Sequence, residues 1–149
     1  MSLRDPITQL PNEALFMDRL GQALALARRK RTRIGLLQLA LEDGDALTDD
    51  EVLRALASRI GTQLRNTDTV SRLGDHDFTV LLSDVDSRPA ARAVAEELLI
   101  ALSRPLEIAG RSMPLTAHYG LSMFPDDADD EKQLLAQASA ELLRSLTSA

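Results

Sequence analysis

The stretch TVSRLGDHDFTVLL, residues 69–82, consists of two apolar runs on either side of a short polar turn. Thr69 to Leu73 and Phe78 to Leu82 are both rich in residues that favour extended structure. Between them, Gly74-Asp75-His76-Asp77 has the composition of a tight turn. The stretch therefore predicts a β-hairpin, and the rest of the chain can be arranged around it.

Helical patterns lie on both sides of this hairpin. Apolar residues recur at helical spacing in four segments, and a capping residue precedes each of them. Thr48 and Glu51 have the spacing of a capping box, and Pro89 suits the first turn of a helix. We expect helices at about 12–30, 48–64 and 87–102, and a last one capped by Asp129 or Asp130 and continuing along 134–143.

Short apolar segments fill the gaps between these helices. Ile34 to Leu41 has the pattern of a buried central strand. Further strands are expected at 106–108 and 113–115, around Ala109-Gly110-Arg111, and at 116–124. The order helix, strand, helix, hairpin, helix, strands, helix predicts an α/β (α+β) fold. Its centre would be a mixed, mainly antiparallel sheet of about five strands wrapped by helices.

Length and composition restrict the class of protein. A chain of 149 residues, 44% of them hydrophobic, suits a single domain. We interpret 4–149 as that domain and 1–3 as an expression leader. The absence of cysteine fits a reducing compartment, so we expect a cytoplasmic domain, and apolar runs this short predict no membrane contact. A net charge of −6 and 3% aromatic residues argue against nucleic-acid binding.

Several segments, in order and over nearly the whole length, resemble the GGDEF domain of diguanylate cyclases. Asp5 to Asn12 reads DPITQLPN, where the family has D-x-L-T-G-L-x-N. Arg72 to Phe78 reads RLGDHDF, where the family has R-(Y/L)-G-G-D-E-F. Segments 105–110, 116–122 and 125–126 are similar to domains found beside EAL phosphodiesterase domains. The resemblance implies a sheet related to the palm of adenylate cyclases, in a bacterial protein with neighbouring EAL and sensor domains.

The signature turn departs from the pattern of active members. In those members its glycines let the backbone approach GTP, and an acidic residue helps to hold Mg²⁺. Here Gly74 and Phe78 remain, but Asp75 replaces the second glycine and His76 replaces the next acid. Only Asp77 keeps a carboxylate. A β-carbon and a negative charge at Asp75 would crowd and repel a phosphate.

Other catalytic positions of the family are also changed. Ala40 and Glu42 stand where the family has its D-x-D metal ligands, and alanine cannot bind a metal. The segment after Glu42, which recognises guanine in active relatives, is about seven residues short. Leu146 and Leu143 replace the family's closing lysine and tyrosine. The resemblance thus implies a degenerate domain with no catalytic residues, no metal ligands and no cofactor.

Arg65 and Asp68 match the family's R-x-x-D inhibitory site, which binds cyclic di-GMP. A guanidinium can grip a phosphate and a carboxylate can accept guanine N–H groups. The leading function is thus a regulatory or protein-interaction module, and the alternative is a receptor for cyclic di-GMP, or for GTP in a remnant of the old pocket. Relatives also use a further arginine from the next helix or a neighbouring copy; Arg92 lies on that helix, but the family's usual place is nearer Glu96-Glu97. The competing interpretation is an exposed helix-end arginine and a turn aspartate without a ligand.

Three other charged features are interpreted as structural. The basic run Arg28-Arg29-Lys30-Arg31 fits a solvated helix C-terminus better than an anion or membrane site. His76 is interpreted as solvated, and His118 as a hydrogen-bonded strand residue. The acidic clusters at 42–45 and 126–130 lack the spacing of a calcium loop.

Overall fold

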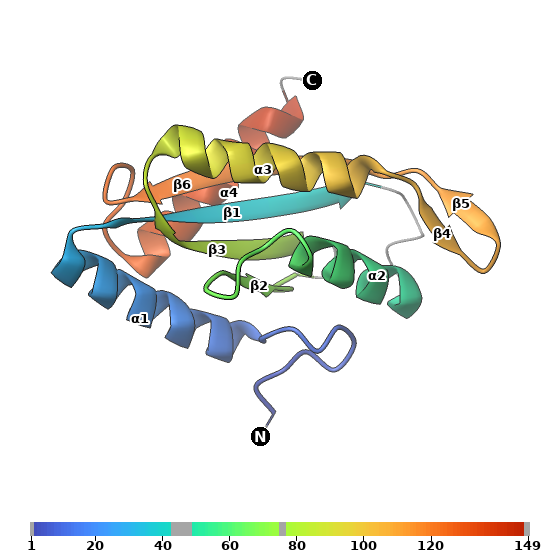
Figure 1. Ribbon diagram of the computed structural model, residues 1–149, viewed down its shortest axis with the longest axis horizontal. Coiled ribbons are helices and arrows are strands. Elements are labelled where there is room, and N and C mark those ends of the chain that lie inside the picture. The colour runs from blue at the N-terminus through green and yellow to red at the C-terminus, as the bar shows by residue number, and fades with distance from the viewer. Residues whose placement is uncertain (1, 43–48, 75–76, 148–149) are drawn as a thin grey trace.

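The computed structural model describes residues 2–42, 49–74 and 77–147. Within them the chain forms a four-stranded sheet with helices on both faces (Figure 1). A separate two-stranded hairpin, β4–β5, extends from the end of α3. The elements in chain order are α1 (Glu13–Lys30), β1 (Arg33–Glu42), α2 (Asp50–Gly61), β2 (Thr69–Ser71), β3 (Asp77–Val85), α3 (Arg88–Ser103), β4 (Leu106–Ile108), β5 (Arg111–Met113), β6 (Thr116–Phe124) and α4 (Glu131–Thr147).

The predicted α/β (α+β) class with a central sheet wrapped by helices is confirmed. The strand order is β2-β3-β1-β6, and the described strands pair antiparallel throughout. The sheet therefore has four strands and no parallel pair, where about five strands in a mixed sheet were expected. The predicted β2–β3 hairpin is present, with β3 extending to Val85.

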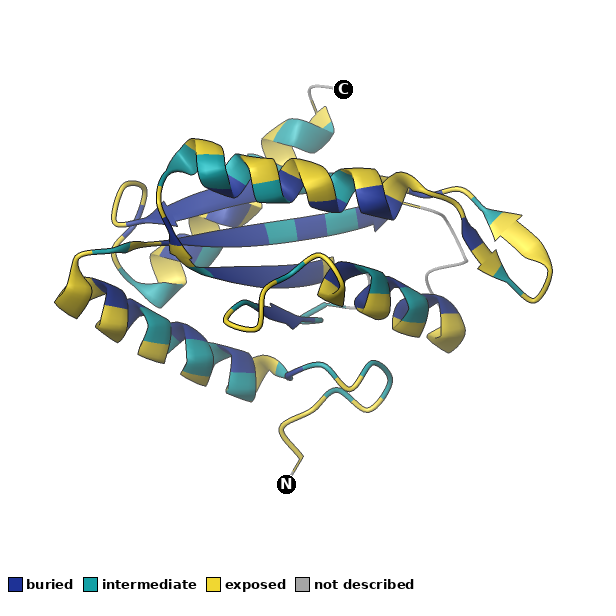
Figure 2. Ribbon diagram, viewed as in Figure 1, coloured by how far each residue is buried: buried dark blue, intermediate teal, exposed yellow. Residues whose placement is uncertain are grey.

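Strand β1 lies in the middle of the sheet because its apolar residues serve both faces. Side chains alternate along a strand, so Leu37 and Leu39 pack with α2 and α3, while Ile34 and Leu36 pack with α1 and α4. The core thus has two parts, one on each face of the sheet. Figure 2 shows the strands buried between helices whose outer faces are exposed.

The helix starts follow the capping signals in most cases. The Asn12 side chain accepts from Leu15 N at 3.1 Å, and the Ser87 side chain accepts from Ala90 N at 3.2 Å. At α4 the cap is Asp130, which accepts from Gln133 N at 2.8 Å. These three helices begin as predicted.

Helix α2 differs from its prediction at both ends. Its N-cap is Asp49, which accepts from Glu51 N at 2.8 Å, while Thr48 lies outside the described residues. The helix ends at Gly61 instead of continuing to Leu64. Glycine carries the largest backbone entropy cost in a helix, and the chain turns there through a hydrogen bond from Gln63 N to Ile60 O.

The β4–β5 hairpin is tighter than predicted. Ile108 pairs with Arg111, so β5 is Arg111–Met113 instead of the expected 113–115. The two turn residues, Ala109 and Gly110, have φ of 54° and 77°. A two-residue turn of the favoured type requires positive φ at both positions, which glycine supplies at the second.

Helix α4 lies directly against the edge strand β6. A β-carbon at Gly120 would come within 2.1 Å of Ala138 O and 2.4 Å of Leu142 N, both on α4. Glu141 of α4 also accepts a hydrogen bond from Leu121 N at 3.1 Å. The missing side chain at Gly120 is what allows this approach.

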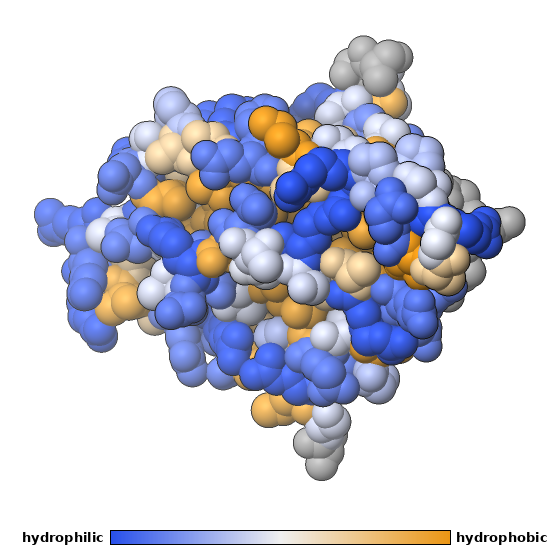
Figure 3. All heavy atoms as spheres, turned by 45° about the vertical axis from the view of Figure 1, so that its right-hand side comes forward, coloured by the Kyte–Doolittle hydropathy of each residue, from blue (hydrophilic) through white to orange (hydrophobic). Residues whose placement is uncertain are grey.

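The surface is mainly hydrophilic on the face that Figure 3 shows, with apolar residues in separate patches. Exposed large apolar side chains include Ile100 of α3 and Leu143 of α4. Among the described helices, none is both long enough and apolar enough to cross a membrane.

Candidate functional site

The residues that stand at the metal positions of the resemblance lie at the end of β1. By strand register Ala40 has Asp77 of β3 on one side and His118 of β6 on the other. Ala40 is half-buried and Asp77 is exposed. The methyl group of Ala40 thus occupies the central place of a polar row and offers no metal ligand.

Glu42 lies two residues further along the same strand. Its Oε2 is 3.6 Å from Nε2 of His118, and 61% of the Glu42 side chain is exposed. Across residues 2–42, 49–74 and 77–147, no three His, Cys, Asp or Glu side chains gather as metal ligands would. At this end of β1, His118 and Glu42 therefore contact each other near the surface, and the described side chains do not form a two-metal site.

The flanks of the signature turn are ordered by packing. Phe78 is fully buried in the core. A β-carbon at Gly74 would lie 3.1 Å from Asp77 Oδ2, so the turn brings the Asp77 carboxylate close to the backbone of Gly74. The predictions for Asp75 and His76 fall outside the described residues.

Asp68 and Arg65, the R-x-x-D residues, bind to each other and to β3. The Asp68 carboxylate accepts from Arg65 N at 3.1 Å and from Ser83 N at 3.2 Å. The Arg65 side chain pairs with Asp68 at 3.3 Å and donates to Ser83 O at 2.6 Å. Only 3% of the Asp68 side chain is exposed, against 57% for Arg65. The arrangement fixes the turn before β2 and leaves the guanidinium half in solvent.

Arg92 does not join the R-x-x-D pair. It lies on α3, where it donates to the Tyr119 hydroxyl at 3.1 Å and pairs with Glu141 of α4 at 3.4 Å. The Tyr119 hydroxyl in turn donates to Glu96 at 3.0 Å. Burial raises the pKa of Tyr119, and the hydrogen bond to Glu96 acts in the same direction. This network links α3, β6 and α4, and it borders a groove of about 410 Å³.

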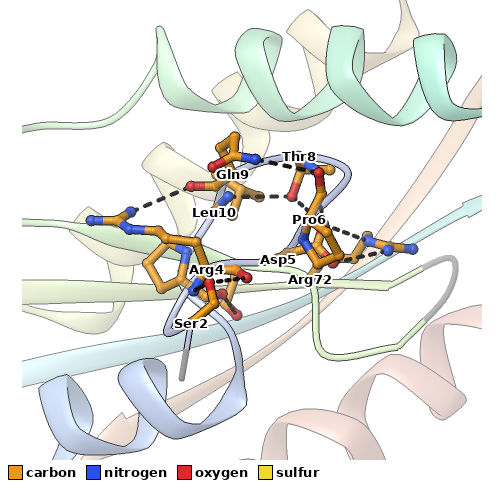
Figure 4. Close-up of polar contacts among 10 residues, drawn as sticks. Ser2, Arg4, Asp5, Pro6, Thr8, Gln9, Leu10 and Arg72 are labelled. Atoms are coloured by element: carbon orange, nitrogen blue, oxygen red, sulfur yellow. Dashed lines mark hydrogen bonds and ion pairs between the residues drawn. The ribbon is translucent and has the colours of Figure 1, made fainter.

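An ion pair that the sequence did not predict joins Asp5, the first residue of the DPITQLPN segment, to Arg72, the first residue of the RLGDHDF segment (Figure 4). Asp5 Oδ1 lies 3.1 Å from Arg72 Nη2, and the side chains are only 12% and 11% exposed. Asp5 Oδ2 also accepts from Thr8 N at 2.9 Å and Thr8 Oγ1 at 2.6 Å. Burial alone would raise the pKa of Asp5, but the hydrogen bonds from Arg72 and Thr8 outweigh it and lower that pKa.

The Asp5 loop is thereby fixed to the segment that leads into the signature turn. Ser71 strengthens the connection by donating a hydrogen bond from its hydroxyl to Pro11 O. The Asp5 and Thr8 spacing signals a local turn in the sequence. The partner Arg72 is 67 residues away, and no local pattern identifies it.

Helix α4 carries the two leucines at the family's tyrosine and lysine positions. Leu143 is 63% exposed and Leu146 is half-buried. Neither side chain can donate a hydrogen bond or carry a charge. The last turn of α4 therefore contributes no cation from these two positions.

The comparisons with known proteins agree with the fold. The family described as diguanylate cyclase, GGDEF domain, matches residues 2–147. The chain is 32% identical over 149 residues to the bifunctional diguanylate cyclase/cyclic di-GMP phosphodiesterase MucR of Pseudomonas aeruginosa, covering 95% of this chain and 22% of MucR. It is also 32% identical to the diguanylate cyclase TpbB of the same species, over 90% of this chain and 33% of TpbB.

Solved structures of GGDEF domains have the same fold. The isolated GGDEF domain of TpbB from Pseudomonas aeruginosa matches with a TM-score of 0.92 at 30% identity, covering 98% of this chain and 90% of that one. The FimX GGDEF domain matches with a TM-score of 0.88 at 22% identity, over 100% and 96% of the two chains. The chain spans between a fifth and a third of the length of MucR and TpbB.

Proposed function

Because the chain belongs to the GGDEF domain family, we propose that it is a catalytically inactive member that acts as a regulatory or protein-interaction module. The family occurs in cyclic di-GMP signalling proteins such as MucR. Residues 4–149 would form one cytoplasmic domain. Its partners would be EAL and sensor domains of a longer chain, or a separate protein.

The observation that carries this proposal is Ala40. It occupies the centre of the β3-β1-β6 row, where its neighbours are Asp77 and His118. Two-metal phosphoryl transfer needs oxygen ligands fixed on rigid strands, and a methyl group cannot take that place. Leu146 supports the same conclusion, because it brings no charge to a triphosphate.

Turnover of GTP tests the proposal directly. The purified domain is incubated with GTP and Mg²⁺ or Mn²⁺, and cyclic di-GMP is measured by chromatography beside a cyclase-competent GGDEF domain. We expect no product from this chain. Robust synthesis of cyclic di-GMP by the unmodified domain would overturn the proposal.

A second candidate function is binding of cyclic di-GMP, and one observation favours it. The Arg65 side chain is 57% exposed, so a phosphate can reach it from solvent. Asp68 is committed to Arg65 and Ser83, so a guanine contact at its carboxylate would require that turn to open. The free energy needed to open that turn would lower the affinity for the ligand.

Isothermal titration distinguishes the two functions. Micromolar binding of cyclic di-GMP that Arg65→Ala weakens sharply would identify a receptor. Binding that is unchanged in Arg65→Ala would reject this site. If neither cyclic di-GMP nor GTP with Mg²⁺ binds, the result supports a protein-interaction module.

A further inference from the structure

A basic pocket lies at the opposite end of the sheet from Ala40. Helix α1 ends there, β1 begins there at Arg33, and β6 ends there at Phe124 (Figure 1). Ala40 is seven residues along β1 from Arg33, which corresponds to about 23 Å of extended strand. The pocket is therefore separate from the signature turn, and neither Arg65 nor Asp68 lines it.

The walls of this pocket combine cations with apolar surface. Its volume is about 350 Å³, and its lining consists of Ala27, Arg28, Arg31, Thr32, Arg33, Phe124 and Pro125. Three of these seven residues are arginines and none is acidic. In a chain of net charge −6, five basic residues fall within 28–33. The electrostatic potential of the pocket thus favours an anion.

Two of the arginines are held in place by the protein. The Arg28 guanidinium lies 5.4 Å from the centre of the Phe124 ring and donates to the carbonyl oxygen of Asp129. Arg33 pairs with Asp126 at 3.1 Å and donates to Asp86 O at 3.3 Å. Within the described part of the chain, Arg28 is held without a carboxylate, whereas Arg33 is held by the carboxylate of Asp126, which does not line the pocket. Fixed donors lose less entropy when a ligand binds.

Arg31 differs from the other two. It is exposed, and its side chain has no ion pair or hydrogen bond to the described part of the chain. Its backbone adopts φ 57° and ψ 45° at the end of α1, a conformation in which glycine is the usual residue. The position thus carries a guanidinium that the described residues do not bind, in the lining of a pocket that two other arginines also line.

We propose that this pocket binds a phosphate group, with Arg31 and Arg28 as its ligands and Arg33 as a positioning cation. A phosphate has enough oxygen acceptors to bridge two guanidinium groups, and the planar fork of arginine suits that geometry. The apolar surface of Ala27, Phe124 and Pro125 would contact the organic part of a phosphate ester. The proposal is independent of the signature turn and of the R-x-x-D pair.

Pyrophosphate is the probe for the test, and Arg31→Gly is the principal variant. Glycine adopts positive φ without strain, so this variant is expected to fold. Arg29→Gln is the matched control: it removes the same charge, and Arg29 lies in the last turn of α1, two residues before the C-cap Arg31, without lining the pocket. Binding is measured by isothermal titration at low salt, and the site is located by backbone amide shifts.

Saturable binding of pyrophosphate with amide shifts at Thr32 and Arg33 is the expected result. Arg31→Gly should weaken it about tenfold, the typical effect of losing one charge-assisted contact, while Arg29→Gln should change it less than about twofold. Equal losses in both variants, or no saturable binding, would overturn the proposal.

A second arm distinguishes a free phosphate ester from a lipid headgroup. Vesicles of neutral lipid with and without phosphatidic acid are sedimented with the protein. Binding to the acidic vesicles that Arg31→Gly abolishes and Arg29→Gln retains would identify a headgroup as the source of the phosphate. Vesicle binding that both variants reduce equally, without pyrophosphate binding, would instead show a diffuse basic surface and reject the pocket.

Discussion

Asp68 and Arg65 are three residues apart but have very different surroundings. The Asp68 carboxylate is buried and accepts from the N–H groups of Arg65 and Ser83, whereas the Arg65 side chain is more than half exposed. The proposed ligand contact and the structural contacts therefore fall on different members of the same short motif. Replacing each residue separately can separate the two functions.

Asp68→Ala should lower the free energy of unfolding by about 2 kcal/mol, because two backbone donors lose their acceptor. Arg65→Ala removes a half-exposed side chain but leaves the Asp68 carboxylate its two backbone N–H donors, so it should cost less, about 1 kcal/mol. Urea denaturation of both variants at neutral pH measures the difference. If Asp68→Ala costs no more than Arg65→Ala, the carboxylate does not hold the turn.

At the scale of elements, the contact between α4 and β6 depends on one glycine. Gly120→Ala would place a methyl group within 2.1 Å of Ala138 O, so α4 must move away from the sheet. We expect a loss of about 3 kcal/mol in unfolding free energy, measured by urea denaturation.

Gly61→Ala is the matched control for this substitution. Gly61 is the last residue of α2, and a β-carbon there meets no atom within 4 Å. Alanine in a compatible helical position should stabilise the protein by up to about 1 kcal/mol. Similar effects of the two substitutions would contradict the close approach at Gly120.

The position of the N-terminal loop depends on the Asp5 carboxylate, which binds Arg72 and Thr8. Because the pKa of Asp5 is lower in the folded than in the unfolded chain, its stabilisation is complete above the unfolded value of about 4. That stabilisation is lost as the pH falls through the lower folded pKa. The Asp5 contribution should therefore be present at neutral pH and absent in strong acid.

Asp5→Asn checks this pH dependence. At pH 7 the variant should be less stable than the wild type by roughly 3 kcal/mol, since Arg72 loses its largely buried partner. The difference should shrink steadily below about pH 4. Thermal unfolding of both proteins between pH 7 and pH 2.5 follows it. A gap that stays constant with pH would mean that the charge on Asp5 contributes nothing.

For the whole molecule, the proposed loss of catalysis is distributed over several elements. Ala40 belongs to β1, Asp75 to the signature turn and Leu146 to α4. The resemblance also implies that the segment after Glu42 is shorter than in active relatives. Restoring one or two positions should therefore leave the others missing.

The double variant Ala40→Asp, Asp75→Gly should form no cyclic di-GMP from GTP and Mg²⁺. Under the proposed function, the guanine-recognising segment and the closing lysine would still be missing. Chromatographic product analysis measures this outcome, with circular dichroism to confirm folding. Product formation by the double variant would show that these two positions alone account for the loss.

The sequence by itself determined the element order, the fold class and most helix starts. These features depend on neighbours within a few residues, as Asn12 and Ser87 show by capping the helices that follow them. The resemblance also located the signature turn and the R-x-x-D pair. Local spacing was sufficient for the helix starts, whereas the turn and the pair were identified only by their likeness to family motifs.

Only the tertiary structure decided what the site residues contact. Three contacts join segments that are far apart in the chain. They are the hydrogen bond of Asp68 with Ser83, the Asp5–Arg72 ion pair, and the pocket that Arg28, Arg31 and Arg33 line together with Phe124. The four-strand sheet and the early end of α2 were decided at the same level. Such contacts depend on how the sheet brings distant segments together, and no local pattern of residues encodes that distance.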